Sequence, residues 1–119
     1  LLAGKVMAKD MIQSAREATV FLKALANENR LLILCHLVDG EKSVSELERL
    51  LQIRQPTLSQ QLARLRTENL VKTRRDAKTI FYSLKSEDVV LTIQLMSKLF
   101  CERDNHPVIQ LTRTLAPAA

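Results

Sequence analysis

The stretch Ile53–Leu84, IRQPTLSQQLARLRTENLVKTRRDAKTIFYSL, decides the fold, because it contains a polar helix followed by a basic hairpin. Pro56 suits the first turn of a helix, where the N–H that proline lacks has no helical partner. At about 100° per residue, Leu58, Leu62 and Leu65 fall on one side of this helix, so we expect them to face the core. The opposite side is polar and is therefore open to a partner.

The polar side of this helix carries groups that can bond to DNA. Gln can bond adenine through two atoms, Arg can bond guanine or phosphate, and Ser and Thr bond either. The residues of the helix that we predict to contact DNA are Gln55, Pro56, Thr57, Ser59, Gln60 and Arg64. A polar side opposite a leucine stripe is also typical of an ordinary solvated helix, so the helix alone leaves both interpretations open.

The hairpin that follows favours the DNA interpretation. Asn69 is expected to end the helix in the left-handed conformation, and Val71–Arg75 and Lys78–Ser83 predict two strands around Asp76 and Ala77. The basic residues near its tip are Arg74, Arg75 and Lys78. A basic wing beside a recognition helix can hold flanking phosphates or the minor groove while the helix enters the major groove. The alternative is an exposed hairpin whose charges provide solubility and protect its edge.

The net charge of the chain is concentrated in the same segment. Residues 54–78 contain seven Lys or Arg against two Asp or Glu, whereas the other 94 residues contain eleven of each, so the formal net charge of +5 lies here. Such a segment favours a polyanion as partner. Three Phe and one Tyr are too few for the aromatic platforms on which single strands stack. Duplex DNA is therefore the predicted partner.

The sequence before this segment predicts three more helices. Apolar residues recur with helical spacing from Met11 to Leu25, and Asn27 is a suitable N-cap for a second helix over ENRLLILCHLV. Ser43 and Glu46 have the spacing of a capping box, which begins a short third helix. Helix, short turn and helix is the arrangement of proteins that read the major groove.

The last helix, which follows Ser86, is apolar on nearly all sides between Val89 and Cys101. A chain of 119 residues forms one domain with a modest core, which does not leave enough other surface to cover this helix. We therefore expect a symmetric homodimer that presents two recognition helices to an inverted repeat in the operator. We assign residues 1–106 to the DNA-binding and dimerisation domain and 107–119 to a C-terminal tail.

The sequence argues against a membrane protein and against an enzyme. No apolar run reaches the roughly 18 residues that span a bilayer, and no signal peptide is recognisable, so we expect a cytoplasmic protein. There is no Cys-x-x-Cys, no glycine loop for phosphate, and no His paired with an acidic residue around a nucleophile. A thiol peroxidase and a pure protein-interaction module are the alternatives from other classes.

Three stretches together resemble one family: LKALANENRLLILC, SVSELERLLQIRQPTLSQQLARLR and LVKTRRDAKTIFYSL. The arrangement from Phe21 to Cys101 is similar to the ArsR/SmtB winged-helix repressors, and these stretches resemble the branch of the biofilm growth-associated repressor BigR, of SqrR and of HlyU. The resemblance implies a mainly α, homodimeric winged helix-turn-helix with about five helices, a two-stranded wing, and a dimer interface from the first and last helices. The chain departs from this family at Asn69 and Ala77, where relatives often carry Gly.

The metal sites of this family are not recognisable. The third helix has no cysteine where relatives often carry Cys-x-Cys, and the last helix lacks an Asp-x-His start. Cys35 and His36 point about 100° apart on their helix and cannot easily share a metal. The remaining candidate ligands are Cys101, Glu102, Asp104 and His106. We therefore predict no metal and no cofactor, and keep a metal-sensing repressor as an alternative.

Two cysteines remain, Cys35 in the second helix and Cys101 at the end of the last. Either one alone is well explained as a small apolar residue, but a cytosolic pair is often regulatory. Their positions resemble the reactive pair of the BigR branch, which implies sensing of reactive sulfur species: persulfides or polysulfides would crosslink the thiols through sulfur atoms and release the operator. The residues that could stabilise a thiolate nearby are His36, Lys98 and Arg103. An antirepressor of the HlyU kind, which displaces another repressor, is a second alternative.

Overall fold

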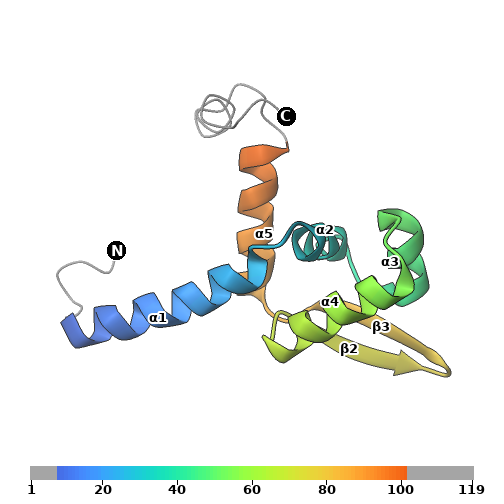
Figure 1. Cartoon of the computed structure of the whole chain (residues 1–119), viewed down its shortest axis with the longest axis horizontal. Helices are drawn as coiled ribbons and strands as arrows, with labels where there is room; N and C mark the ends of the chain where they lie inside the picture. Colours follow the sequence, from blue (N-terminus) through green and yellow to red (C-terminus); the bar gives the residue numbers. More distant parts are fainter. Residues whose placement is uncertain (1–7, 102–119) are drawn as a thin grey trace.

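The computed structural model describes residues 8–101 as five helices and a three-stranded antiparallel sheet (Figure 1). The elements are α1 (Ala8–Leu25), α2 (Glu28–Leu37), β1 (Lys42–Ser43), α3 (Val44–Leu51), α4 (Gln55–Thr67), β2 (Val71–Asp76), β3 (Thr79–Leu84) and α5 (Glu87–Phe100). Within these residues, no helix combines the length and the apolar character that crossing a membrane requires. The predicted domain boundary at residue 106 lies outside the described residues.

The core forms where α2 packs against α3, α4 and α5. The predicted stripe of α4 is confirmed, because Leu58, Leu62 and Leu65 are at most 1% exposed. The largest of the other fully buried side chains are Ile33, Leu34, Leu47, Leu70 and Ile93. Each buried side chain of this size contributes about 1.5–3 kcal/mol relative to exposure. The burial of its leucines fixes the rotation of α4 and leaves its polar side outward.

The predicted caps of α2 and α3 are confirmed. The side chain of Asn27 accepts a hydrogen bond from the backbone N–H of Arg30 at 3.0 Å. At α3, the backbone N–H of Ser43 donates to the Glu46 carboxylate at 3.0 Å, and the Glu46 N–H donates to the Ser43 hydroxyl at 3.2 Å. The hydrogen bond from the Ser43 backbone lowers the pKa of Glu46. These contacts satisfy N–H groups that have no helical partner and so fix where each helix begins.

The exit from α4 is a Schellman motif built on Asn69. This residue has φ 61°, its N–H donates to the Arg66 carbonyl, and the N–H of Leu70 donates to the Leu65 carbonyl. The predicted left-handed conformation of Asn69 is therefore confirmed, and it turns the chain directly into β2.

The sheet contains one more strand than the two of the wing that the sequence predicts. β2 and β3 pair in an antiparallel register with Thr73 opposite Tyr82, and the two-residue strand β1 pairs with the other edge of β3. The strands extend to Asp76 and begin again at Thr79, so the turn consists of Ala77 and Lys78. A two-residue strand has no detectable alternation, which is why β1 was not predicted.

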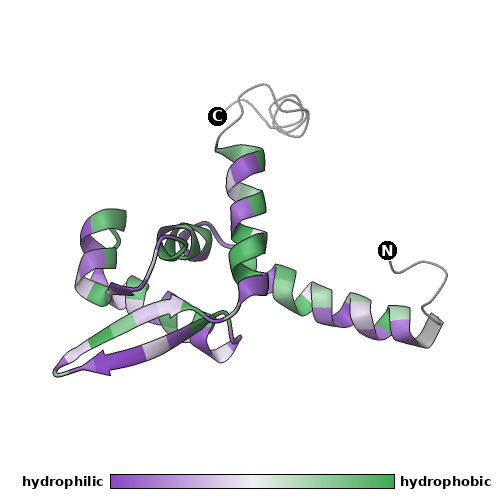
Figure 2. Ribbon diagram, turned by 180° about the vertical axis from the view of Figure 1, so that it is seen from behind, coloured by the Kyte–Doolittle hydropathy of each residue, from purple (hydrophilic) through white to green (hydrophobic). Residues whose placement is uncertain are grey.

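Helix α1 extends away from the rest of the molecule (Figure 1). From Asp10 onward, only its last residues, Ala24 and Leu25, are buried. Figure 2 shows apolar residues along both α1 and α5. The large apolar side chains that are exposed on these two helices are Met11, Ile12, Val20, Leu22, Leu91, Leu95 and Phe100. An exposed apolar area of this kind is typical of an interface.

Ala77 has φ 57° at the first position of the wing turn, where glycine is preferred. We predict that Ala77→Gly raises the free energy of unfolding by about 0.5–1 kcal/mol, because glycine relieves the steric cost of this conformation and loses only part of the gain as backbone entropy. Denaturant unfolding measures the change. Ala63→Gly, at an exposed site within α4, is the control and should lower stability by about 1 kcal/mol. A destabilised Ala77→Gly would contradict the prediction.

Candidate nucleic-acid interface and thiol site

The outer side of α4 is a continuous polar surface. All six side chains of the predicted contact set on this helix are exposed: Gln55, Pro56, Thr57, Ser59, Gln60 and Arg64. Ala63 is also exposed among them and leaves room for close approach. Arg64 forms an exposed ion pair with Glu68 at 3.3 Å, which contributes little to stability and is readily exchanged for another anion. Arg64 is therefore still able to bind a phosphate.

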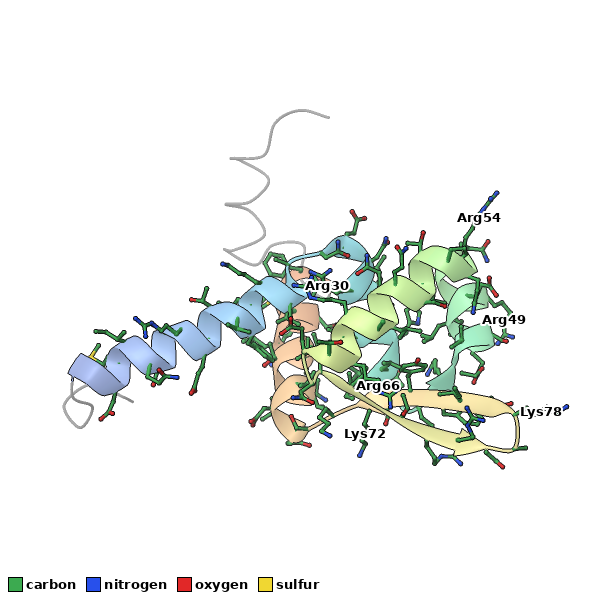
Figure 3. All side chains as sticks on the ribbon, turned by 60° about the horizontal axis from the view of Figure 1, so that its bottom comes forward. Arg30, Arg49, Arg54, Arg66, Lys72 and Lys78 are labelled. Carbon is green, nitrogen blue, oxygen red and sulfur yellow. The ribbon has the colours of Figure 1, made fainter. Side chains whose placement is uncertain are left out.

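The basic residues of the wing differ in their surroundings. Arg75 and Lys78 are exposed, and Figure 3 shows Lys78 at the wing tip and Arg54 at the start of α4, both pointing outward. The wing lies beside α4 (Figures 1 and 3), and β2 contacts this helix. This arrangement places basic groups at the edges of the polar surface of α4.

Arg74, by contrast, is held within the protein's own contacts. Its Nε and Nη2 donate to the two carboxylate oxygens of Glu41 at 3.1 and 2.5 Å, and its guanidinium lies 4.7 Å from the ring centroid of Phe81. The hydrogen bond to Arg74 lowers the pKa of Glu41, and the same contact raises the pKa of Arg74. Arg74 therefore fixes the chain before β1 to the wing and is less available to DNA than Arg75.

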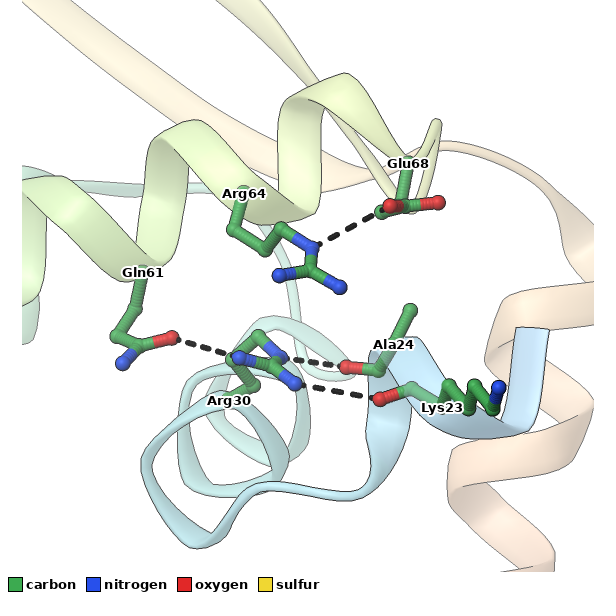
Figure 4. A network of polar contacts seen from close by, with 6 residues as sticks. All are labelled: Lys23, Ala24, Arg30, Gln61, Arg64 and Glu68. Atoms are coloured by element: carbon green, nitrogen blue, oxygen red, sulfur yellow. Dashed lines mark hydrogen bonds and ion pairs between the residues drawn. The ribbon is translucent and has the colours of Figure 1, made fainter. Parts of the chain in front are cut away.

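Arg30 is a structural residue that the sequence did not single out. It is 9% exposed, and its guanidinium joins three helices (Figure 4). Nε donates to the carbonyl of Ala24 at 2.6 Å, Nη2 to the carbonyl of Lys23 at 3.2 Å, and Nη1 to the side-chain oxygen of Gln61 at 3.1 Å. Arg30 thus satisfies carbonyls at the end of α1 and holds α4 to α2. The sequence contains one signal of this role, because Arg30 is a single arginine in the otherwise largely apolar helix ENRLLILCHL.

The two cysteines, far apart in sequence, line one cavity between α2 and α5. This cavity of about 410 Å³ has a lining that is almost entirely apolar carbon and sulfur. Its lining residues are Glu28, Leu31, Leu32, Cys35, Met96, Ser97, Phe100 and Cys101. Both thiols are free, Cys35 is half-buried and Cys101 is exposed. The fold thus brings Cys35 and Cys101 to the same site.

Burial raises the pKa of the Cys35 thiol, and the negative charge of the Cys101 thiolate raises it further. Since the thiolate is the nucleophile, Cys35 is the weaker attacking group near neutral pH. Lys98 lines a second, more polar depression beside Cys35. Arg103, the other cation proposed to assist a thiolate, lies outside the described residues.

Within residues 8–101, no three His, Cys, Asp or Glu side chains gather closely enough to hold a metal ion. The candidate ligands Glu102, Asp104 and His106 lie outside this part of the chain. The described residues therefore provide no support for the metal-sensing alternative.

The comparisons with known proteins agree with this fold. Residues 27–73, from the cap of α2 into β2, match the arsR family of bacterial regulatory proteins. The transcriptional activator HlyU of Vibrio cholerae is 48% identical over 94 residues, which are 79% of this chain and 87% of HlyU. The chain belongs to the ArsR family. The structure of reduced HlyU from V. cholerae aligns over 78% of this chain and 98% of that one with a TM-score of 0.75.

Two further solved structures are similar to this chain. The transcriptional repressor BigR of Xylella fastidiosa aligns with a TM-score of 0.74 and 42% identity, over 82% of this chain and all of that one. The homodimeric winged helix-turn-helix DNA-binding domain of a possible ArsR-family regulator from Mycobacterium bovis aligns with a TM-score of 0.65 and 30% identity, over 81% of this chain and 87% of that one. The predicted fold class and the resemblance to the BigR and HlyU branch are confirmed, and the chain is a transcriptional regulator rather than an enzyme.

We predict that iodoacetamide modifies Cys101 faster than Cys35 at neutral pH, because Cys101 is exposed and the raised pKa of Cys35 keeps that thiol protonated. The rate at Cys35 should continue to rise with pH above the ordinary range of a cysteine thiol, about 8.5. Peptide mass spectrometry after timed quenching measures both sites. In urea the two rates should converge, and equal rates in the folded protein would contradict the assignment.

Proposed function

We propose that this ArsR-family regulator is a homodimeric repressor that binds operator DNA when Cys35 and Cys101 are reduced. A persulfide or polysulfide crosslinks the two thiols and releases the DNA. The observation that carries this proposal is the shared cavity of the two cysteines between α2 and α5. BigR, a relative of this chain, is described as a transcriptional repressor.

In this proposal α4 reads the major groove and the wing holds the flanking backbone. Gln60 and Arg64 bond base edges or phosphate from the exposed side of α4, and Arg75 and Lys78 bind phosphates from the wing. Gln55, Pro56, Thr57 and Ser59 line the approach at the start of the helix. Arg74 acts mainly through Glu41 and Phe81, by keeping the wing in place.

The dimer would form through α1 and α5. Both helices carry large apolar side chains that the single chain leaves exposed, among them Leu22 on α1 and Leu91 and Leu95 on α5. The related domain from M. bovis is homodimeric. A symmetric dimer would present two α4 helices to the half-sites of an inverted repeat.

The order of the two steps that form the crosslink follows from the accessibility of the thiols, because Cys101 is exposed and Cys35 is half-buried. The Cys101 thiolate attacks the outer sulfur of a persulfide RS–SH, RS⁻ leaves, and Cys101 becomes a persulfide. The Cys35 thiolate then attacks the Cys101 sulfur, expels HS⁻ and forms the disulfide, so one RS–SH oxidises two thiols to a disulfide and is reduced to RSH and H₂S. If a second RS–SH first adds one sulfur to either thiol, RSH leaves, and closure again expels one HS⁻. The bridge then contains three sulfur atoms, and two RS–SH yield two RSH and one H₂S.

The crosslink would act on DNA binding through α2. Cys35 and Arg30 lie on this helix, and Arg30 holds Gln61 of α4. Drawing α2 toward the end of α5 would disturb this contact together with the dimer interface, and so change the spacing of the two reading helices. Each lost base or phosphate contact lowers operator affinity.

One observation favours a second candidate. HlyU, which is 48% identical to this chain, is described as a transcriptional activator. An antirepressor that displaces another repressor would use the same DNA surface and the same thiols. The two candidates differ in the effect of deleting the gene, since expression of the target rises for a repressor and falls for an antirepressor.

We predict that Gln60→Ala costs about 1–3 kcal/mol of specific operator binding. Arg75→Ala should instead weaken binding to all sequences and lower the slope of log K against log salt concentration by about one. Fluorescence anisotropy with operator and random duplexes at several salt concentrations measures both. Arg74→Ala is the matched control: because Arg74 is paired with Glu41, its loss should change the salt dependence less than loss of Arg75. Unchanged binding in both Gln60→Ala and Arg75→Ala would contradict the assignment of α4 and the wing as the DNA-binding surface.

We also predict that polysulfide treatment of the reduced protein produces an intramolecular species in which Cys35 and Cys101 are linked, with loss of two hydrogens alone or with added sulfur atoms. Operator affinity should fall with its formation. Cys35→Ser and Cys101→Ser should each bind the operator, because neither residue lies near the polar side of α4, yet neither should release it after treatment. Mass spectrometry beside an operator-binding titration measures both changes. Release of a cysteine-free variant by polysulfide, or release of the wild type by zinc alone, would contradict the sulfur switch.

A further inference from the structure

The cavity in which one reagent can contact both thiols is apolar. The cavity lined by Cys35 and Cys101 is walled by Leu31 and Leu32 of α2 and by Met96 and Phe100 of α5. Its volume of about 410 Å³ is in the range of small-molecule sites. Glu28, in the first turn of α2, also belongs to the lining. Because almost none of the lining surface is polar, its carbon atoms contribute to the wall and its negatively charged carboxylate lies outside it.

The more polar depression beside Cys35 does not give a reagent access to both thiols. It is lined by Asp39, Gln94 and Lys98 and reaches Cys35, but Cys101 does not belong to its lining. An anionic reagent that Lys98 attracts to this depression could therefore reach the Cys35 thiol but not the Cys101 thiol. The reagent that begins the bridge at the exposed Cys101 meets the apolar cavity.

We propose that this cavity selects the sulfur donor by charge: it accepts persulfides whose organic part is small and uncharged and disfavours persulfides that carry carboxylates. The inference rests on the proposed function and adds the class of inducer. A carboxylate that enters the cavity loses water without gaining a hydrogen-bond partner from the apolar walls, and it is repelled by Glu28. An uncharged organic part instead gains from burial against Leu32, Met96 and Phe100.

The test compares two persulfides that differ in one charge, N-acetylcysteine persulfide and its methyl ester. The measurement is the rate at which the Cys35–Cys101 crosslink forms in the full chain, followed by mass spectrometry after acid quenching. Each rate is divided by the rate at which the same reagent modifies the urea-unfolded chain, which removes the intrinsic difference in reactivity. We expect the normalised rate of the ester to exceed that of the acid by about tenfold or more. This ratio is of the size expected from repulsion between two unit charges a few ångströms apart near a protein surface.

A charge variant connects the preference to the cavity. Glu28→Gln should raise the normalised rate of the acid several-fold and leave that of the ester unchanged. Glu87→Gln is the matched control, because Glu87 is also exposed in the first turn of a helix but does not belong to the cavity lining. Circular dichroism and operator binding of the reduced variants establish that both retain the fold.

The outcomes separate this inference from the proposed function. Equal normalised rates for the two persulfides, or equal effects of Glu28→Gln and Glu87→Gln, would overturn the charge selection while the crosslink itself stands. Absence of a crosslink with either reagent would overturn the proposed function, and the inference with it. A faster ester, with the difference reduced in Glu28→Gln alone, is the result that supports selection by the cavity.

Discussion

The buried guanidinium of Arg30 is the contact on which the relative positions of the helices depend. Two of its donors meet the last carbonyls of α1, and a third meets Gln61 of α4. Hydrogen bonds from a charged donor are worth about 1.5–3 kcal/mol each, and the carbonyls at a helix end have no partner within the helix. One side chain of α2 therefore holds the helix that carries the exposed apolar surface and the helix that carries the polar surface.

This arrangement makes α2 the element that connects the functions of the molecule. One side of it forms the core through Ile33 and Leu34, its beginning binds α1 and α4 through Arg30, and its middle presents Cys35 to α5. A change at Cys35 cannot move α2 without affecting Arg30, because a helix of ten residues is rigid over this distance. In the proposed switch, a change at Cys35 would thus reach the DNA-binding helix without a long path.

The wing illustrates how a basic residue can serve the fold rather than the partner. Arg74 and Arg75 are adjacent in sequence, but alternation along a strand sends their side chains to opposite faces of the sheet. Both side chains are exposed, but Arg74 meets Phe81 and Glu41, whereas Arg75 forms no such ion pair among the described residues. The sequence predicted both as DNA contacts, since charge alone does not distinguish them. The acidic partner that separates their roles lies 33 residues away in the chain.

The sequence by itself determined what depends on local spacing. The caps at Asn27 and Ser43, the leucine side of α4, the left-handed Asn69 and the hairpin follow from contacts within a few residues, which a linear pattern contains. Tertiary structure alone decided the pairing of β1 with β3, the engagement of Arg74 by Glu41, the contacts of Arg30, and the apolar cavity that Cys35 and Cys101 share. Those contacts join segments far apart in the chain, and their geometry is set by how the buried leucines pack rather than by any local preference of the residues involved.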